Sequence, residues 1–139
     1  MNDNDVAALY KSPKVKALVS LTRGEGYGLP ILEAAASGLP VIATNWSGHL
    51  DFMKHVKFIS IDYALTQVHP SRVDDKIFMR NSKWAEPLEA DFKKKITKFR
   101  NGHSVPKEWA VEGANKILEL YNHDSVTQVY EEKLSEYLK

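Results

Sequence analysis

Two glutamates flank a glycine-rich stretch within the segment "TRGEGYGLPILEAAASGLPVIAT", which runs from Thr22 to Thr44. Glu25 lies among three alternating glycines, and Glu33 follows it after seven intervening residues. Glycine allows unusual backbone angles and lets backbone N–H groups approach a ligand without obstruction by side chains. Carboxylates accept hydrogen bonds from hydroxyl groups, as the acidic residue on the ribose does in dinucleotide sites. The pattern therefore predicts a ligand that offers an anion to the amides and hydroxyl groups to the acids.

The elements around this stretch follow an α/β pattern. The sequence predicts strands over residues 15–22, 40–44 and 56–61, because these runs are apolar, short and rich in β-branched residues. It predicts a helix over residues 28–38, with Pro30 at the first helical position and Gly38 as a left-handed cap, and a short helix over residues 49–53. Strands that alternate with helices indicate a Rossmann-like parallel sheet, in which ligands bind outside the carboxyl ends of the strands.

The helix that begins near Pro30 explains why acids and amides occur together. Its free N–H groups and the positive end of its dipole favour a phosphate or another oxyanion. A nucleotide sugar carries a diphosphate as well as sugar hydroxyls. It therefore satisfies both features of the stretch, and we expect it as the substrate, with no further cofactor.

The rest of the chain is less regular at first and helical at its end. A short amphipathic turn is expected over residues 6–10, whereas residues 62–83 show no sustained period and predict an irregular surface insertion. From residue 87 to residue 139 the apolar spacing predicts three helices. We therefore expect one partial nucleotide-sugar-binding domain over residues 1–139, because three strands make a small sheet for a doubly wound fold.

Composition narrows the functional classes. The 139 residues are 43% hydrophobic and carry a net charge of +1, so no chain-wide field favours nucleic acid as a partner. The chain has no cysteine, and its histidines lack the spacing of metal ligands, so no metal site is expected. The first residues do not resemble a signal peptide, and no apolar run approaches membrane-spanning length. These features predict a cytoplasmic domain.

The stretch "EGYGLPILE" followed by "AAASGLPVIAT" resembles the signature of retaining glycosyltransferases with the GT-B architecture, the group 1 or family 4-like enzymes. The resemblance implies that Glu33 binds the ribose hydroxyls of the nucleotide and that Glu25, as the catalytic residue, contacts the donor sugar. It implies that the backbone of Gly26, Tyr27, Gly28 and Leu29 meets the sugar and the diphosphate. The implied reaction is transfer of a sugar from a nucleotide donor with retention at the anomeric carbon.

The chain also departs from that pattern. The resemblance implies an acceptor domain and an upstream half of the donor domain, with an Arg/Lys pair on the diphosphate, before the matching residues. We therefore expect the incomplete, C-terminal half of a GT-B donor domain, inactive alone, whose partners are those missing parts. A full-length enzyme of this kind is expected in the cytoplasm, including at the membrane periphery. Arg23 is a candidate substitute for a phosphate cation, and the uncovered sheet edge favours self-association.

Each candidate also has a plainer interpretation. Glu25 and Glu33 are alternatively a loop acid and a helix acid, Arg23 an ordinary surface arginine, and Trp46 either stacks on a sugar or base or closes an edge of the core. For His49 and Asp51, an acid/base role competes with a capping and surface role, which we expect. Two other functions remain as alternatives: a hydrolase that uses the paired glutamates, and a non-catalytic domain that binds a nucleotide or a partner chain.

Overall fold

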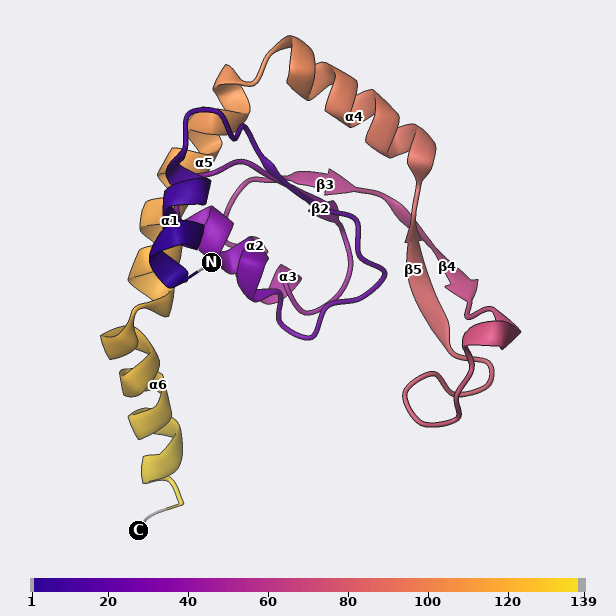
Figure 1. Ribbon diagram of the computed structural model, residues 1–139. Helices are drawn as coiled ribbons and strands as arrows, with labels where there is room; N and C mark the ends of the chain where they lie inside the picture. The colour runs from indigo at the N-terminus through magenta and orange to yellow at the C-terminus, as the bar shows by residue number, and fades with distance from the viewer. Residues whose placement is uncertain (1, 138–139) are drawn as a thin grey trace.

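The computed structural model describes residues 2–137, and its centre is a small parallel sheet (Figure 1). The sheet has the order β1-β2-β3, formed by β1 (Leu18–Ser20), β2 (Val41–Thr44) and β3 (Ile59–Ile61). In the register, Val19 lies beside Ile42, which in turn lies beside Ile59. All four residues of the central strand β2 are buried. An apolar strand of this kind is typical of a parallel sheet that is covered on both faces.

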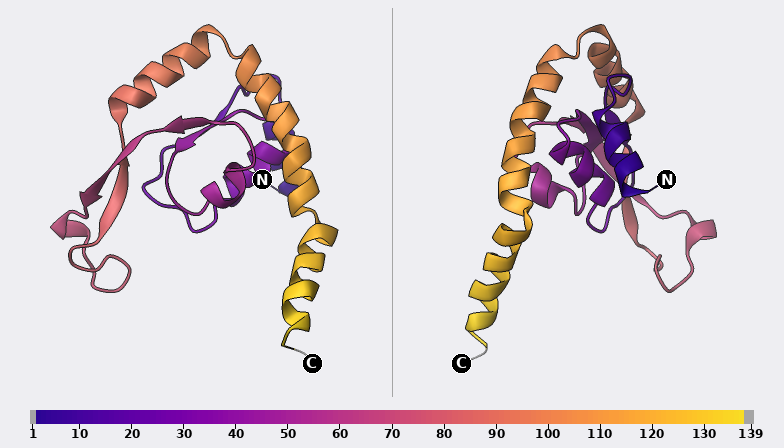
Figure 2. Two further views of the ribbon diagram at one scale, coloured as in Figure 1. Left: turned by 180° about the vertical axis from the view of Figure 1, so that it is seen from behind. Right: turned by 60° about the vertical axis from the view of Figure 1, so that its left-hand side comes forward.

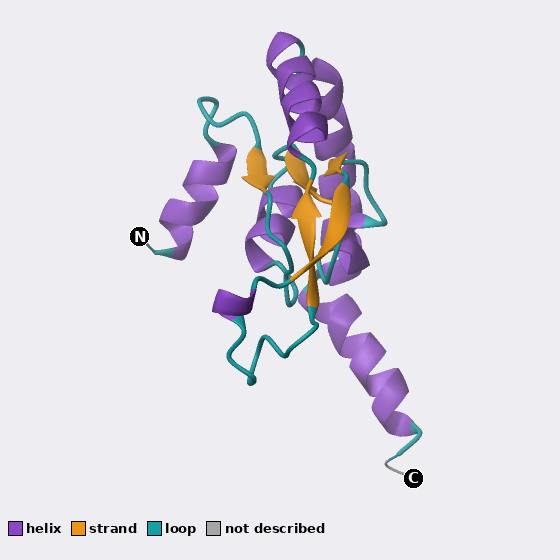
Figure 3. Cartoon of the chain, turned by 90° about the vertical axis from the view of Figure 1, so that its right-hand side faces the viewer, coloured by secondary structure: helices purple, strands orange, loops and turns teal. Residues whose placement is uncertain are grey.

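Helices cover the two faces of the sheet unequally. On one face, Val41 and Ala43 pack in a core with residues of α2 (Leu29–Ala36), α3 (Leu50–Met53) and α5 (Ser104–Tyr121). Tyr10 of α1 (Asp3–Lys11) packs against the edge of this core. On the other face, Ile42 and Ile61 pack against α4 (Glu89–Asn101). The result is a layer of helices on each side of the strands, the Rossmann-like α/β fold class that the sequence predicts (Figure 3).

The helix α2 begins and ends at glycines with left-handed backbone. Gly28 is its N-cap with φ of 87°, so the helix begins at Leu29 and Pro30 is its second residue rather than the expected first. At the other end, Gly38 has φ of 68°, as predicted, and its N–H donates to Ala35 O at 3.1 Å. The N–H of Leu39 donates to Ala34 O at 3.0 Å, which completes a Schellman motif. These caps fix the length and position of α2.

The segment 62–83 is more regular than the sequence predicts. It contains β4 (Tyr63–Gln67) and a 3-10 turn (Pro70–Arg72), and β4 pairs antiparallel with β5 (Lys83–Pro87). Residues 73–82 form neither helix nor strand, as expected, and Val68 is the one buried residue of the segment. Figure 1 shows this hairpin extending away from the three-stranded sheet. The sequence missed it because most of the side chains of β4 face solvent, so no alternating apolar pattern marks the strand.

The helical end of the chain agrees with the apolar spacing. The three helices are α4, α5 and α6 (His123–Ser135). The helix α6 continues beyond the end of α5 and projects away from the sheet, as both views in Figure 2 show. Within residues 2–137, none of the helices combines the length and apolar character needed to cross a membrane.

Candidate functional site

The glycine loop, residues Thr22–Gly28, leaves the carboxyl end of β1 and leads directly into α2. Gly28 ends it in the left-handed region, and a Cβ there would lie 2.9 Å from the Cβ of His49. No acceptor contacts the backbone N–H of Tyr27, Gly28 or Leu29 within residues 2–137. The loop and the first turn of α2 therefore present free donors at the end of the sheet where ligands of this fold class bind.

A second turn, residues Asn45–His49, holds the glycine loop in place and is called here the facing turn. The hydroxyl of Ser47 donates to the carbonyl of Glu25 at 2.6 Å and accepts from the N–H of Glu25 at 2.9 Å. The N–H of Gly48 donates to the same carbonyl at 3.2 Å. Ser47 itself adopts φ of 92°, which is uncommon for a residue with a Cβ. The two turns are thus joined through the backbone of Glu25.

The two glutamates lie in different surroundings. Glu25 is half-buried in the glycine loop, whereas Glu33 is exposed on α2, in the second turn after the N-terminus. The hydroxyl of Tyr10 lies 3.5 Å from a carboxylate oxygen of Glu33. Burial raises the pKa of Tyr10, and the charge of Glu33 raises this pKa further. Along the chain, one acid therefore precedes the free amides at the start of α2 and the other follows them.

The remaining candidates have protein partners of their own. Arg23 forms a bidentate ion pair with Glu86 of β5, with 2.9 Å between the second pair of atoms. The hydrogen bond from Arg23 lowers the pKa of Glu86. The ring of Tyr27 packs on Phe52 at 5.3 Å between centroids, so Tyr27 contributes its backbone N–H, rather than its ring, to the set of free donors. Leu29 is 59% exposed at the helix start.

The surface position expected for His49 is wrong. His49 is the N-cap of α3, as expected, but its side chain is 1% exposed. Its Nε2 lies 2.8 Å from the carbonyl of Thr44, so Nε2 carries the proton and donates it. Its Nδ1 and the hydroxyls of Thr22 and Thr44 are buried without a partner in the described part of the chain. The glycine at position 28 is the signal for this packing, because a Cβ there would come too close to the Cβ of His49.

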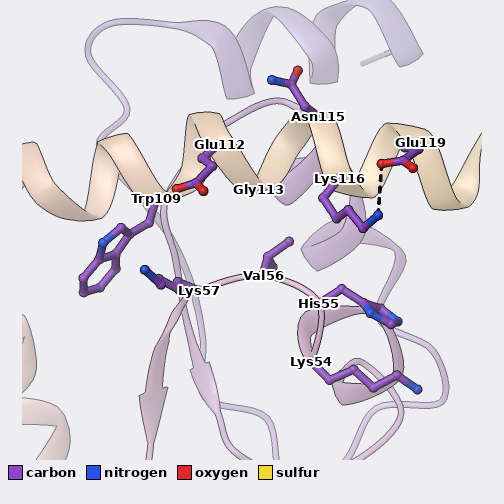
Figure 4. Close-up of a pocket in the computed structure, with 10 residues that line it drawn as sticks. All are labelled: Lys54, His55, Val56, Lys57, Trp109, Glu112, Gly113, Asn115, Lys116 and Glu119. Carbon is purple, nitrogen blue, oxygen red and sulfur yellow. Dashed lines mark hydrogen bonds and ion pairs between the residues drawn. The ribbon is translucent and has the colours of Figure 1, made fainter.

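Two hollows differ in their position relative to the glycine loop. A cavity of about 670 Å³ lies between α5 and residues 54–57, which precede β3 and are therefore at the opposite end of the sheet from the glycine loop (Figure 4). Its cations have partners, since Lys116 pairs with Glu119 and Lys57 lies over the ring of Trp109. A second hollow of about 510 Å³, the aromatic cleft, adjoins the glycine loop. It is lined by Leu21, Thr22, Arg23, Gly24, Trp46, Phe78, Lys83 and Trp84.

Comparison with known proteins gives a match to one family over part of the chain. Residues 1–69 match the family described as "Glycosyl transferases group 1". The matching segment contains the glycine loop, α2, the facing turn and all three strands of the parallel sheet. No curated protein and no solved structure matches the chain. The match supports a group 1 glycosyl transferase and, at that level, the resemblance that the motif suggests.

Proposed function

We propose that this domain binds the nucleotide-sugar donor of a retaining glycosyltransferase of GT-B architecture. The family match supports glycosyl transfer in general, and the observation that carries the proposal is the set of free amides at residues 27–29 between Glu25 and Glu33. A diphosphate fits these donors because backbone N–H groups and the helix dipole both attract negative charge there. The acids on each side then receive hydroxyl groups.

The order of the donor across the site follows from the two acids. Glu33 lies on a helix whose position is fixed by its glycine caps and by buried Ala34 and Ala35, so its carboxylate is suited to the ribose, which has a constant geometry. Glu25 lies in the glycine loop, with its backbone held by Ser47, and is suited to the transferred sugar. The nucleoside is therefore on the α2 side of the amides and the sugar on the loop side.

The proposed chemistry is the transfer of a glycosyl group from the diphosphate to a hydroxyl of an acceptor. The bond between the anomeric carbon and the diphosphate oxygen breaks, and the leaving nucleoside diphosphate keeps the electron pair. The amides of Gly28 and Leu29 face the charge that develops on that phosphate, which is the kind of preorganised stabilisation that lowers a barrier most. The oxygen of an acceptor hydroxyl then bonds to the anomeric carbon on the face that the diphosphate leaves, and the proton of that hydroxyl passes to the departing diphosphate. We propose that the acceptor is presented by a further domain or chain.

Calorimetric titration tests this assignment. UDP, GDP and ADP, and then UDP-glucose, GDP-mannose and ADP-glucose, are titrated into the chain and into Glu33→Gln and Glu25→Gln variants. Glu33→Gln should weaken the nucleoside diphosphate and its sugar conjugate alike, by roughly 1.5–3 kcal/mol, as expected for hydrogen bonds to a charged group. Glu25→Gln should weaken only the sugar conjugate, since its carboxylate faces the sugar.

The matched control is Glu108→Gln, which removes an exposed carboxylate from α5. Binding by this variant should equal that of the unchanged chain. If no nucleotide binds, or if Glu33→Gln and Glu108→Gln behave alike, the donor assignment is overturned. Equal losses for both ligands in Glu33→Gln and Glu25→Gln would overturn the division of roles between the two acids.

A further inference from the structure

We propose that the aromatic cleft binds a pyranose ring next to the glycine loop, an inference that rests on the proposed function. The cleft lies between the facing turn and the β4–β5 hairpin, and Thr22, Arg23 and Gly24 belong both to its lining and to the glycine loop. Its volume of about 510 Å³ is within the range of small-molecule sites, and three of its eight lining residues are aromatic. It is therefore a continuation of the donor site rather than a separate hollow.

The first wall is Trp46 in the facing turn. Its side chain is 37% exposed although it is one of the largest apolar groups of the chain. One side of the ring is supported by Tyr63 of β4, at 5.1 Å between centroids, and the next residue, Ser47, is bonded to Glu25. Trp46 is thus a partly exposed aromatic surface. Its position next to Glu25 is fixed by Tyr63 and Ser47, and it does not close an edge of the core.

The second wall belongs to the hairpin. The guanidinium of Arg23 lies 4.5 Å from the centre of the Trp84 ring, and Phe78 meets the same ring edge-on at 6.0 Å. The N–H of Ala85 donates to the carbonyl of Arg23 at 3.2 Å, which ties β5 to the glycine loop. Asp74 accepts hydrogen bonds from three backbone amides, including that of Phe78 at 2.9 Å. The aromatic groups of this wall are therefore held by polar contacts at their backbones.

The chemistry of the walls favours a neutral, hydroxylated ring. Arg23 is paired with Glu86, so the charge of its guanidinium is offset. Aromatic faces accept the C–H face of a pyranose, and the polar groups of Thr22 and Lys83 at the lining are suited to its hydroxyls. A nucleobase also stacks on aromatic rings, but it belongs on the other side, because Figure 1 shows the glycine loop between α2, which carries Glu33, and the hairpin.

The three tryptophans of the chain allow a direct test, because Trp46 and Trp84 line the cleft and Trp109 lies on α5. The chain is labelled with 5-fluorotryptophan, and its three fluorine resonances are assigned with single Trp→Phe variants. Methyl α-glucopyranoside, methyl α-mannopyranoside, the nucleoside diphosphates and their sugar conjugates are then added separately. The resonances of Trp46 and Trp84 should move with saccharides while that of Trp109 stays in place.

The probes also distinguish the source of the ring. If the cleft holds the transferred sugar, the nucleotide sugar moves both resonances and the free diphosphate does not. If it holds the sugar of an acceptor, the nucleotide sugar leaves both resonances in place, and a methyl glycoside moves them also when the nucleotide sugar is bound. The proposal is overturned if no saccharide moves either resonance, or if all three tryptophans respond alike. Loss of diphosphate binding with the saccharide response intact would instead overturn the proposed function alone.

Variants give the size of the effect. Trp46→Leu should weaken saccharide binding roughly threefold to tenfold, the range that corresponds to one aromatic contact, and leave diphosphate binding unchanged. Trp84→Leu should weaken saccharide binding to the same extent if the hairpin keeps its fold. If the hairpin of this variant unfolds, Trp46→Leu still tests the cleft, because Trp46 lies outside the hairpin. Trp109→Phe is the matched control. Equal saccharide affinity in Trp46→Leu and Trp109→Phe would refute a role for the cleft.

Discussion

Replacement of Gly48 by alanine should separate the two turns that form the candidate site. A Cβ at position 48 would lie 1.9 Å from the carbonyl oxygen of Gly26, whereas ordinary contact begins at 3.4 Å, so the gap would have to widen by 1.5 Å. Three hydrogen bonds join the backbone of Glu25 to Ser47 and Gly48, and they cannot all survive such a shift. At about 1 kcal/mol each, the free energy of unfolding should fall by roughly 2–3 kcal/mol.

Urea unfolding measures this change, and Gly26→Ala is the matched control on the other side of the same contact. A Cβ at Gly26 meets nothing within 4 Å, and neither Gly26 nor Gly48 has the positive φ that would strain alanine. The stability of Gly26→Ala should therefore stay within about 0.5 kcal/mol of the unchanged chain. The reasoning is refuted if Gly48→Ala is as stable as Gly26→Ala, because the close approach of the turns would then not exist in solution.

Three further outcomes concern the hairpin and the sheet edge. Glu86→Gln should lower the free energy of unfolding at neutral pH by about 0.5–1 kcal/mol. Because Arg23 lowers the pKa of Glu86, the difference between variant and unchanged chain should vanish as pH falls through that pKa. A difference that persists in acid would contradict this prediction. The amides of residues 76–78 lower the pKa of Asp74, so their protection from hydrogen exchange should be lost as pH falls through it, and Asp74→Ala should abolish that protection at neutral pH. Since β1 is an edge strand with Val19 44% exposed, light scattering should show self-association that rises with concentration, and a monomer at all concentrations would count against it.

The parallel sheet and α2 could be predicted because their signals are local. Buried strands read as continuous apolar runs, and the glycine at position 38 marks the end of α2 by its own backbone preference. The first helix, α1, is longer than the residues 6–10 expected for it, because its N-terminal capping box uses polar side chains that carry no apolar period. An element could therefore be predicted when the residues that define it lie within that element.

The contacts between elements could not be predicted in the same way. The close approach of His49 to Gly28 joins residues that are distant in sequence, and the pairing of Arg23 with Glu86 depends on a hairpin whose first strand is mostly exposed. From the sequence, Trp46 is equally consistent with an edge of the core and with a binding surface. The structure distinguishes the two, because it places Tyr63 beside one side of the ring. The sequence thus indicates which residues form the glycine loop, while the facing turn and the cleft emerge only from the packing.

The base of the β4–β5 hairpin is anchored to the start of α4. Both strands meet at Asp62, whose carbonyl accepts from the N–H of Leu88 at 2.8 Å and whose N–H donates to Asp91 of α4 at 2.9 Å. Because Ala85 and Glu86 are also bonded to Arg23, a substitution at Asp91 would loosen the base of the hairpin while its middle stays joined to the glycine loop.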